Sequence, residues 1–318
     1  MRPEEPFNKT EFVFQGLTDN PLIQYIFLLI FLNIYLIIVC GNGVIFVVIW
    51  QNSQLHTPMY IFLLNLSIID IASTSNILPK LCIMVFIQTI SFEDCITQLY
   101  LFISFVCTEA FLLAAMAYDR YVAICYPLHY IIIMSFKHTV GLSVTAWMAG
   151  LLSPVGHVTL ISKMSFCASH VIGHFYCDIS PLLKISCSNI YDVEMLTYVV
   201  GILVGFFTLI FTLLSYVFII SKILSIKSKP GQGKAFSTCS SHLTCVIMFY
   251  GTMMCLHMRP TSTYSSKFDK CFALVYAALV PLLNPFIYSL KNKEIIKGLR
   301  KFKGQIIIKN LLTIKNSI

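Results

Sequence analysis

The sequence predicts an all-α integral membrane protein: a bundle of seven transmembrane helices, with a short amphipathic helix after the seventh span. Composition is the first reason, because 57% of the 318 residues are hydrophobic and only 11% are charged, whereas a soluble domain is about a quarter charged. The second is a set of apolar runs, each long enough to cross a bilayer, which takes about 20 residues. The seven expected spans are residues 23–50, 58–79, 96–118, 139–162, 195–221, 239–258 and 271–290.

The same runs exclude other classes. They do not alternate between apolar and polar residues, so they do not indicate a β-barrel. The net charge of +8 does not indicate nucleic-acid binding, because the basic residues are not clustered on a polar domain; the expected partner is the lipid membrane. We expect an extracellular N-terminus (1–22), a seven-span transmembrane domain (23–290) and a cytoplasmic tail (291–318).

The distribution of charge predicts the orientation. With the N-terminus outside, the inner segments hold 14 of the Lys and Arg residues and the outer segments hold 8, which agrees with the positive-inside rule. The polar, acidic start of the chain does not resemble a cleavable signal peptide. Asn8 begins an N-glycosylation acceptor sequence. These features predict a multi-pass protein of the plasma membrane.

Four cysteines fall on the expected outer side: Cys95, Cys167, Cys177 and Cys187. An even number in an oxidising compartment indicates two disulfides, and the residues alone leave all three pairings open. The outer loop also reads HFYCD at 174–178. Its His, Cys and Asp are possible ligands of a soft metal ion, but no second cluster completes a four-ligand site. We therefore expect no metal and no cofactor.

Four polar residues lie inside the apolar spans. Asp70 and Glu109 fall near the middle of the second and third spans, and Asn42 and Asn284 are their natural partners. Ionisable groups at this depth are costly and usually face the bundle interior. Two interpretations remain open: an ion- or proton-linked switch, and interhelical hydrogen bonds that fix the packing. A proton relay in a transporter is a third, but we see neither internal repeats nor broken helices.

Asp119 and Arg120 form an adjacent charge pair at the end of the third span, where Tyr121 begins an expected loop. From spacing alone, the favoured interpretation is an Arg side chain that reaches the membrane interface. The alternative is a latch, in which the carboxylate holds the Arg until an inner partner binds.

Five strings appear in the order in which one family carries them. They are LHTPMY (55–60), MAYDRYVAIC (116–125), Ser215-Tyr216, KAFSTCSSHL (234–243) and PLLNPFIYSLKN (281–292). With seven spans, they resemble the rhodopsin-like (class A) G-protein-coupled receptors, and among them the olfactory (odorant) receptors. The five strings touch the second, third, fifth, sixth and seventh spans and do not reach the fourth.

The resemblance implies roles for residues that spacing leaves ambiguous. Asp119 and Arg120 become a latch, which reverses the interpretation from spacing. The residues implied in G-protein coupling and switching are Asp119, Arg120, Tyr121, Tyr216, Asn284 and Tyr288. Asn42, Asp70 and Glu109 become the mid-bundle polar network. The implied disulfides are Cys95–Cys177 and Cys167–Cys187.

The resemblance also implies a ligand site between the third, fifth, sixth and seventh helices. The implied lining is Leu99, Phe102, Ile103, Val106, Cys107, Val200, Val204, Tyr250, Met253, Met254, His257, Leu274 and Ala277. It is mostly apolar, as small-molecule pockets are, with Tyr250 and His257 as the polar contacts. No member is charged, so the expected ligand is a small neutral volatile organic molecule.

The expected function is therefore an odorant receptor that activates a stimulatory G protein and raises cyclic AMP. A transporter coupled through Asp70 and Glu109 is the second hypothesis, and an integral membrane enzyme is the third. No catalytic motif such as HExxH or GxSxG occurs, so we expect no enzyme. After the seventh span, KNKEIIKGLRKFKG (291–304) suits an amphipathic helix on the anionic inner leaflet, and a calmodulin target is the alternative.

Overall fold

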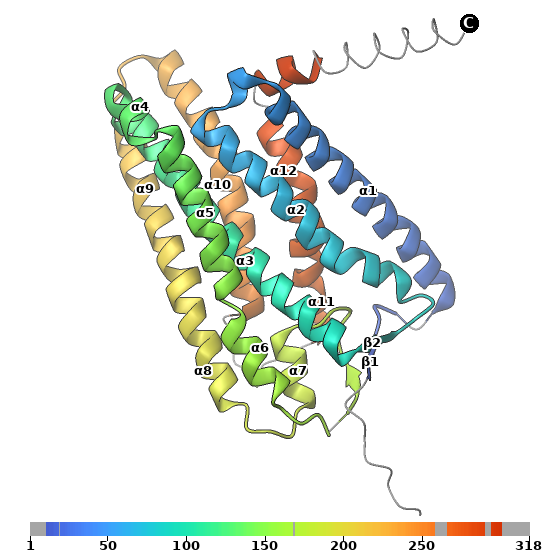
Figure 1. Ribbon diagram of the computed structural model, residues 1–318. Coiled ribbons are helices and arrows are strands. Elements are labelled where there is room, and N and C mark those ends of the chain that lie inside the picture. Colours follow the sequence, from blue (N-terminus) through green and yellow to red (C-terminus); the bar gives the residue numbers. More distant parts are fainter. Residues whose placement is uncertain (1–10, 19, 168, 258–265, 290–293, 301–318) are drawn as a thin grey trace, which may run out of the picture.

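The protein is a bundle of membrane-length helices (Figure 1). The computed structural model describes residues 11–18, 20–167, 169–257, 266–289 and 294–300, and within these ranges seven helices are long and apolar enough to cross a membrane. This confirms the predicted fold class. The spans are α1 (Pro21–Gln51), α2 (Pro58–Ile83), α3 (Phe92–Cys125), α5 with α6 (Phe136–Leu152, Val155–Ser162), α8 with η3 and α9 (Tyr191–Val200, Gly201–Phe206, Phe207–Leu224), α10 (Lys229–His257), and α11 with η5 and α12 (Ser266–Leu274, Val275–Leu279, Val280–Ser289).

Two helices extend well beyond the predicted apolar runs. The side chain of Ser91 caps α3 by accepting from the backbone N–H of Asp94 at 3.0 Å, and Glu93 and Asp94 suit the positive end of the helix dipole. At its other end α3 continues to Cys125, so Tyr121 is helical and does not begin a loop. Helix α10 starts at Lys229, about ten residues before the predicted 239, because hydropathy does not detect polar helical turns outside the bilayer.

Three of the spans are interrupted, contrary to the expectation of unbroken helices. A turn at Ser153 and Pro154 separates α5 from α6, as a proline lacks the backbone N–H that a helix interior needs. The segments η3 and η5 are π-helical turns inside the fifth and seventh spans. Such turns often occur at functional sites, because they redirect side chains.

A small sheet closes one end of the bundle, which we call the strand-bearing end. Its order is β2-β1-β3 (Thr89–Ser91, Glu11–Phe14, Val171–Ile172). Strand β1 pairs antiparallel with β2, Phe12 opposite Ile90, and parallel with β3, Phe14 opposite Ile172. Phe12 and Phe14 are fully buried. The sequence analysis did not anticipate these strands.

The strand-bearing end is tied down further by side chains and covalent links. The ammonium of Lys270 in α11 donates to the backbone carbonyls of Gln15 and Gly16, both at 2.9 Å. Disulfides join Cys95 to Cys177 and Cys167 to Cys187, the two pairings implied by the resemblance. Helix α7 (Ile179–Ile185) follows the first of these links and is largely buried. The segments at the strand-bearing end are therefore part of the packed structure.

The opposite end carries Arg120, and we call it the Arg120 end. Here α4 (Tyr130–Ile133) lies between α3 and α5, at the top of Figure 1. Residues 294–300 form a further short helix, part of the segment predicted to be amphipathic. Ile295 is fully buried, and a Cβ built on Gly298 would lie 2.8 Å from Cγ1 of Val48 in α1. The apolar face of this segment therefore packs on the bundle.

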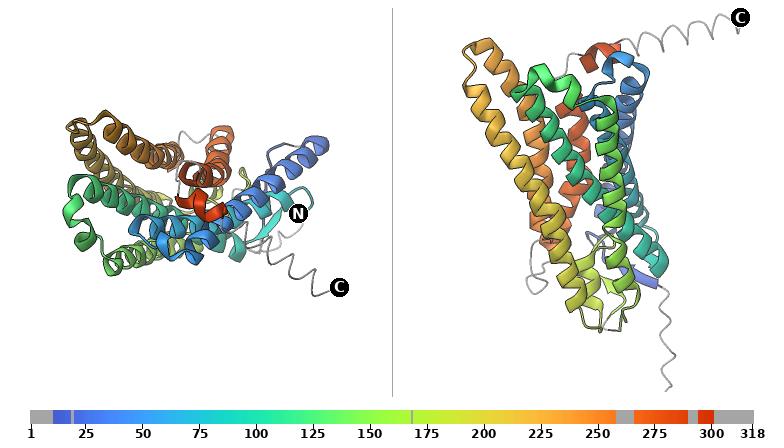
Figure 2. Two further views of the ribbon diagram at one scale, coloured as in Figure 1. Left: turned by 90° about the horizontal axis from the view of Figure 1, so that it is seen from above. Right: turned by 60° about the vertical axis from the view of Figure 1, so that its left-hand side comes forward.

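Helix α3 is the most enclosed span, whereas α1 lies at the edge of the bundle (Figure 2). The outward face of α1 is apolar and exposed, as at Leu22 and Leu29, which suits contact with lipid. Tight packing of α3 on α5 occurs at Gly150, where an added Cβ would lie 2.8 Å from the carbonyl oxygen of Ser104. Helix α3 supplies side chains to the cavity, to the mid-bundle polar contacts and to the ion pair at the Arg120 end, which are described next.

Candidate functional site

A cavity of about 120 Å³ lies between α3, the fourth and fifth spans, α7 and α10. Its walls are built mainly from aliphatic, aromatic and methionine side chains. The lining residues are Ile103, Val106, Cys107, Ala110, His157, Ile179, Thr197, Val200, Gly201, Val204, Gly205, Phe206, Leu209, Phe249, Tyr250, Met253 and Met254. No Asp, Glu, Lys or Arg is among them, so the cavity suits an uncharged apolar ligand.

Eight residues of the implied ligand set line this cavity. They are Ile103, Val106, Cys107, Val200, Val204, Tyr250, Met253 and Met254. Four others, Leu99, Phe102, Leu274 and Ala277, lie outside its lining. The side chain of His257 lies outside the described residues.

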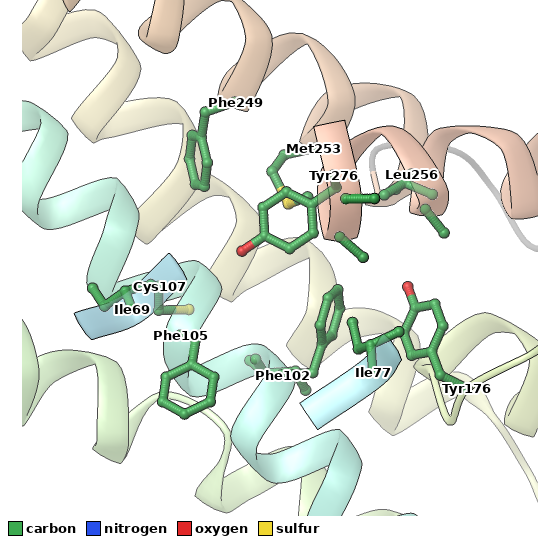
Figure 3. Packing of buried hydrophobic residues seen from close by; sticks show 14 of the residues in the cluster. Ile69, Ile77, Phe102, Phe105, Cys107, Tyr176, Phe249, Met253, Leu256 and Tyr276 are labelled. Carbon is green, nitrogen blue, oxygen red and sulfur yellow. The ribbon is translucent and has the colours of Figure 1, made fainter. Parts of the chain in front are cut away.

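Phe102 instead belongs to an aromatic cluster between the cavity and the strand-bearing end (Figure 3). Its ring centroid lies 5.1 Å from that of Tyr176 and 5.8 Å from that of Tyr276. These rings come from three segments: α3, the loop before α7, and η5. Leu99, one turn before Phe102 on α3, is fully buried as well. The third-helix members of the implied ligand set therefore divide: Leu99 and Phe102 lie in the core, whereas Ile103, Val106 and Cys107 line the cavity.

Tyr250 of α10 lines the cavity and reaches across to α9. Its hydroxyl donates to Oγ1 of Thr208 at 2.8 Å and lies 3.4 Å from the carbonyl oxygen of Ala110. Thr208 in turn donates to the carbonyl oxygens of Val204 and Gly205. The third, fifth and sixth spans are thus joined at one point beside the cavity.

His157 and Thr197 are polar lining residues that the sequence analysis missed. His157 is almost completely buried, and its Nε2 lies 3.2 Å from Oγ1 of Thr197 in α8. The resemblance offered no guide, since its motifs do not reach the fourth span. The available signal was an ionisable side chain inside an apolar run, the criterion that selected Asp70 and Glu109.

Among the described residues, the mid-bundle polar side chains make three hydrogen-bonded contacts between spans. The amide of Asn284 donates to both carboxylate oxygens of Asp70 at 3.1 Å. Glu109 accepts from the hydroxyl of Tyr276 at 3.1 Å. Asn42 donates to the carbonyl oxygen of Pro281 at 3.2 Å. Each contact links two different spans, and Asn42, Asp70 and Asn284 share a small cavity of about 10 Å³.

Asp119 and Arg120 form an ion pair at the Arg120 end of α3. Nη2 and Nε of Arg120 lie 2.8 and 3.1 Å from Oδ2 of Asp119. The other carboxylate oxygen accepts from the hydroxyl of Tyr130 at 2.7 Å. Burial and the neighbouring Asp119 carboxylate raise the pKa of Tyr130, so this hydroxyl keeps its proton and remains a donor.

Tyr216 and His242 join α9 to α10 near this ion pair. The tyrosine hydroxyl lies 2.8 Å from Nδ1 of His242, and the two rings are stacked. Tyr121 contacts Tyr126 edge to face. The side chain of Tyr288 lies outside the described residues. Five of the six implied switch residues are therefore described, and four of them gather at the Arg120 end; Asn284 lies at mid-bundle.

The HFYCD segment does not form a metal site in the described part of the chain, where no cluster of three or more His, Cys, Asp and Glu side chains has suitable geometry. Cys177 is in a disulfide, and Asp178 caps α7 by accepting from the backbone of Ile179. Burial, together with the charge of Lys270, lowers the pKa of His174 to about 3. A neutral, buried His174 stacked on Phe175 is part of the packing.

Comparison with known proteins decides the family. The family model described as "Olfactory receptor" matches residues 31–305. The chain belongs to the olfactory receptor family. The receptor is 46% identical to Olfactory receptor 5AR1 of Mus musculus over 298 residues, 93% of this chain and 96% of the relative. It is 44% identical to Olfactory receptor 5AR1 of Homo sapiens over 96% of this chain and 99% of the relative, and 46% identical to Olfactory receptor 1G1 of Gorilla gorilla gorilla over 92% and 94%.

The family settles the class of function. This receptor is a multi-pass membrane protein that senses odorants and couples to a G protein, and it is not an enzyme. The transporter and enzyme hypotheses are therefore dropped. Because the chain belongs to this class, the apolar cavity is the candidate odorant site, and the ion pair at Arg120 is the candidate switch for the G protein.

Proposed function

We propose that the receptor binds a small, neutral, volatile organic molecule in the cavity beside α3 and activates a stimulatory G protein, which raises cyclic AMP. The observation that supports this proposal is the uncharged, largely apolar lining of a cavity of about 120 Å³. An apolar cavity of about 150 Å³ holds a molecule the size of benzene, so this one suits a compact ligand. We place the receptor in the plasma membrane, with the strand-bearing end outside and Asn8, which lies outside the described residues, as a glycosylation site.

Two helices connect the cavity to the Arg120 end. Helix α3 carries Ala110 in the cavity wall and Arg120 two to three turns later; helix α10 carries Tyr250 in the wall and His242 two turns earlier. A ligand that contacts Tyr250 more favourably when α10 has moved shifts the population toward that state, which is the only way a ligand drives such a change. Movement of α10 separates His242 from Tyr216 and opens the surface around Arg120.

An exposed apolar surface beside Arg120 supports a protein partner there. Leu128, Ile131 and Ile132 are 91%, 83% and 76% exposed, and they follow the end of α3 directly. Apolar side chains this exposed mark interaction surfaces. The freed guanidinium of Arg120 supplies the polar contact at the centre of the same surface.

The test is a cyclic AMP assay in cells that express the receptor with a stimulatory G protein, across a broad panel of neutral volatiles. Arg120→Ala should abolish the response while the purified variant still binds the active compounds. Arg300→Ala, which removes an exposed arginine at the same end, is the matched control and should respond normally. Normal signalling by Arg120→Ala at equal surface expression would contradict the proposed role.

A further inference from the structure

The polar groups in the cavity wall can be sorted by where their hydrogens point. A threonine or tyrosine hydroxyl has one hydrogen to donate and lone pairs that accept, and a neutral histidine has one ring N–H. Among the lining residues, the side chains with N–H or O–H groups are His157, Thr197 and Tyr250. The ligand's hydrogen-bonding chemistry therefore depends on which of these hydrogens is already in use.

On the α10 side of the cavity, the described hydroxyl groups already donate their hydrogens to other atoms of the protein. The hydroxyl of Tyr250 donates to Oγ1 of Thr208 at 2.8 Å. Thr208, directly behind the wall, donates to the carbonyl oxygens of Val204 and Gly205. Neither hydroxyl has a second hydrogen for a ligand.

On the opposite side, the same accounting fixes the histidine tautomer. Thr197 donates its hydrogen to the carbonyl oxygen of Val193 at 2.7 Å. Its Oγ1 must therefore accept in the contact with His157, so Nε2 of His157 carries the N–H, and Nδ1 carries a lone pair. Oγ1 of Thr197 has a second lone pair on a side chain that is only partly buried and lines the cavity.

The other polar groups in the cavity wall also act mainly as hydrogen-bond acceptors. Gly201 and Gly205 bring backbone close to the cavity within η3, and in a helical segment the N–H groups are used in backbone hydrogen bonds. The thiol of Cys107 is only a weak donor. Among the described residues, the cavity wall thus offers hydrogen-bond acceptors to a ligand and lacks a strong donor.

We propose that this cavity selects compact apolar molecules that carry a hydroxyl group, that is, alcohols or phenols, whose O–H donates to Oγ1 of Thr197. Ketones and ethers of the same shape present only acceptor oxygens, and these would face lone pairs on Thr197. A buried polar atom without a partner is costly, so the wall disfavours them. The proposal rests on the proposed function, because it names the ligand class of that same cavity.

The experiment compares two matched pairs of probes: cyclohexanol with cyclohexanone, and phenol with methoxybenzene. Each pair keeps the ring and exchanges the O–H for an acceptor alone. Two readouts run in parallel, the cyclic AMP dose–response in cells and the ligand-induced thermal stabilisation of the purified receptor. For the wild-type receptor we expect each hydroxyl compound to act at about tenfold lower concentration than its partner, the size of one hydrogen bond.

Thr197→Val keeps the shape of the side chain and removes the acceptor, so it should bring the members of each pair to nearly equal potency. Thr159→Val is the matched control, because the exposed Thr159 makes the same kind of bond to its own helix, to the carbonyl oxygen of Val155 at 2.7 Å. That variant should keep the wild-type preference.

The two readouts separate this inference from the proposed function. Stabilisation by the hydroxyl compounds without any cyclic AMP response would support the inference and refute the coupling. Equal or greater potency of cyclohexanone and methoxybenzene would overturn the inference while the receptor function stands. It would be overturned equally by a preference that survives Thr197→Val, or by hydroxyl probes that fail to stabilise the receptor at millimolar concentration.

Discussion

The hydroxyl of Tyr130 donates to Oδ1 of Asp119 at 2.7 Å, while Arg120 binds the other oxygen of the same carboxylate. The segment after α3 therefore holds the carboxylate in the orientation that restrains Arg120. We predict that Tyr130→Phe raises signalling without ligand by about two- to tenfold, the population change expected from one lost hydrogen bond. Cyclic AMP measured at matched surface expression tests this.

The control for that prediction is Tyr126→Phe, which removes an exposed hydroxyl nearby that does not contact Asp119 in the described structure. Its basal signal should equal that of the wild-type receptor. Equal basal signals for both variants would show that Tyr130 does not restrain the ion pair.

The side-chain amide of Asn284 donates to both oxygens of the buried Asp70 carboxyl group. We predict that Asn284→Ala lowers the stability by about 1–3 kcal/mol, because a buried polar group loses its partner. Thermal unfolding of the purified receptor in detergent measures the change. Asn33→Ala, which removes an exposed amide bonded to Leu29 of its own helix, should have almost no effect, and similar losses for both variants would argue against a special role for the Asp70 contact.

Gly150 lets α5 approach α3 closely. A methyl group there would overlap Thr108 and lie 2.8 Å from the carbonyl oxygen of Ser104, so Gly150→Ala should destabilise the receptor by about 1–3 kcal/mol through overpacking. Gly141 lies on the same helix, and its added Cβ would meet no atom within 4 Å apart from its chain neighbours and the backbone of its own helix. Gly141→Ala should therefore stabilise the helix by about 0.5–1 kcal/mol. Opposite shifts in melting temperature are expected, and a tolerated Gly150→Ala would disprove the close approach.

We predict that the stability of the strand-bearing end depends on pH because of His174. Its folded pKa of about 3 lies below the ordinary 6.5, so below about pH 6.5 the unfolded chain takes up a proton that the folded protein refuses. As the pH is lowered from about 6.5 to about 3, the free energy of unfolding should therefore fall by about 1 kcal/mol per pH unit. His174→Phe should flatten the dependence of melting temperature on pH. His129→Phe, at an exposed position, should leave it unchanged, and an unaltered slope in His174→Phe would contradict the assignment.

The seven spans were predictable because burial in lipid demands long apolar runs, whatever the side chains do afterwards. The ends of α3 and α10 were not, since polar turns outside the bilayer leave no hydropathy signal. The π-helical turn at Gly201 and the turn at Pro154 depend on local backbone packing. A single proline is tolerated in other spans, as Pro79 is within α2, so the residue type alone does not locate a break.

The lining of the cavity was likewise only partly predictable from the sequence. Periodicity on α3 marks one face, but it does not reveal that Phe102 packs against Tyr176 and Tyr276 while Cys107 reaches the cavity. That split depends on the loop before α7, which is far away in sequence. The contact between His157 and Thr197 likewise joins two spans whose relative rotation no motif encodes.

The placement of β1 has a consequence for how the chain is assembled. Residues 11–14 are synthesised before residues 89–91 and 171–172, yet they form the central strand between them. The sheet cannot be completed until the first four spans and the segment that contains β3 have been synthesised. Pairing over such sequence distances is slow, because a long loop must close before any contact is gained. Strand β1 thus reaches its final position late, and the burial of Phe12 and Phe14 reports that the first four spans are already in place.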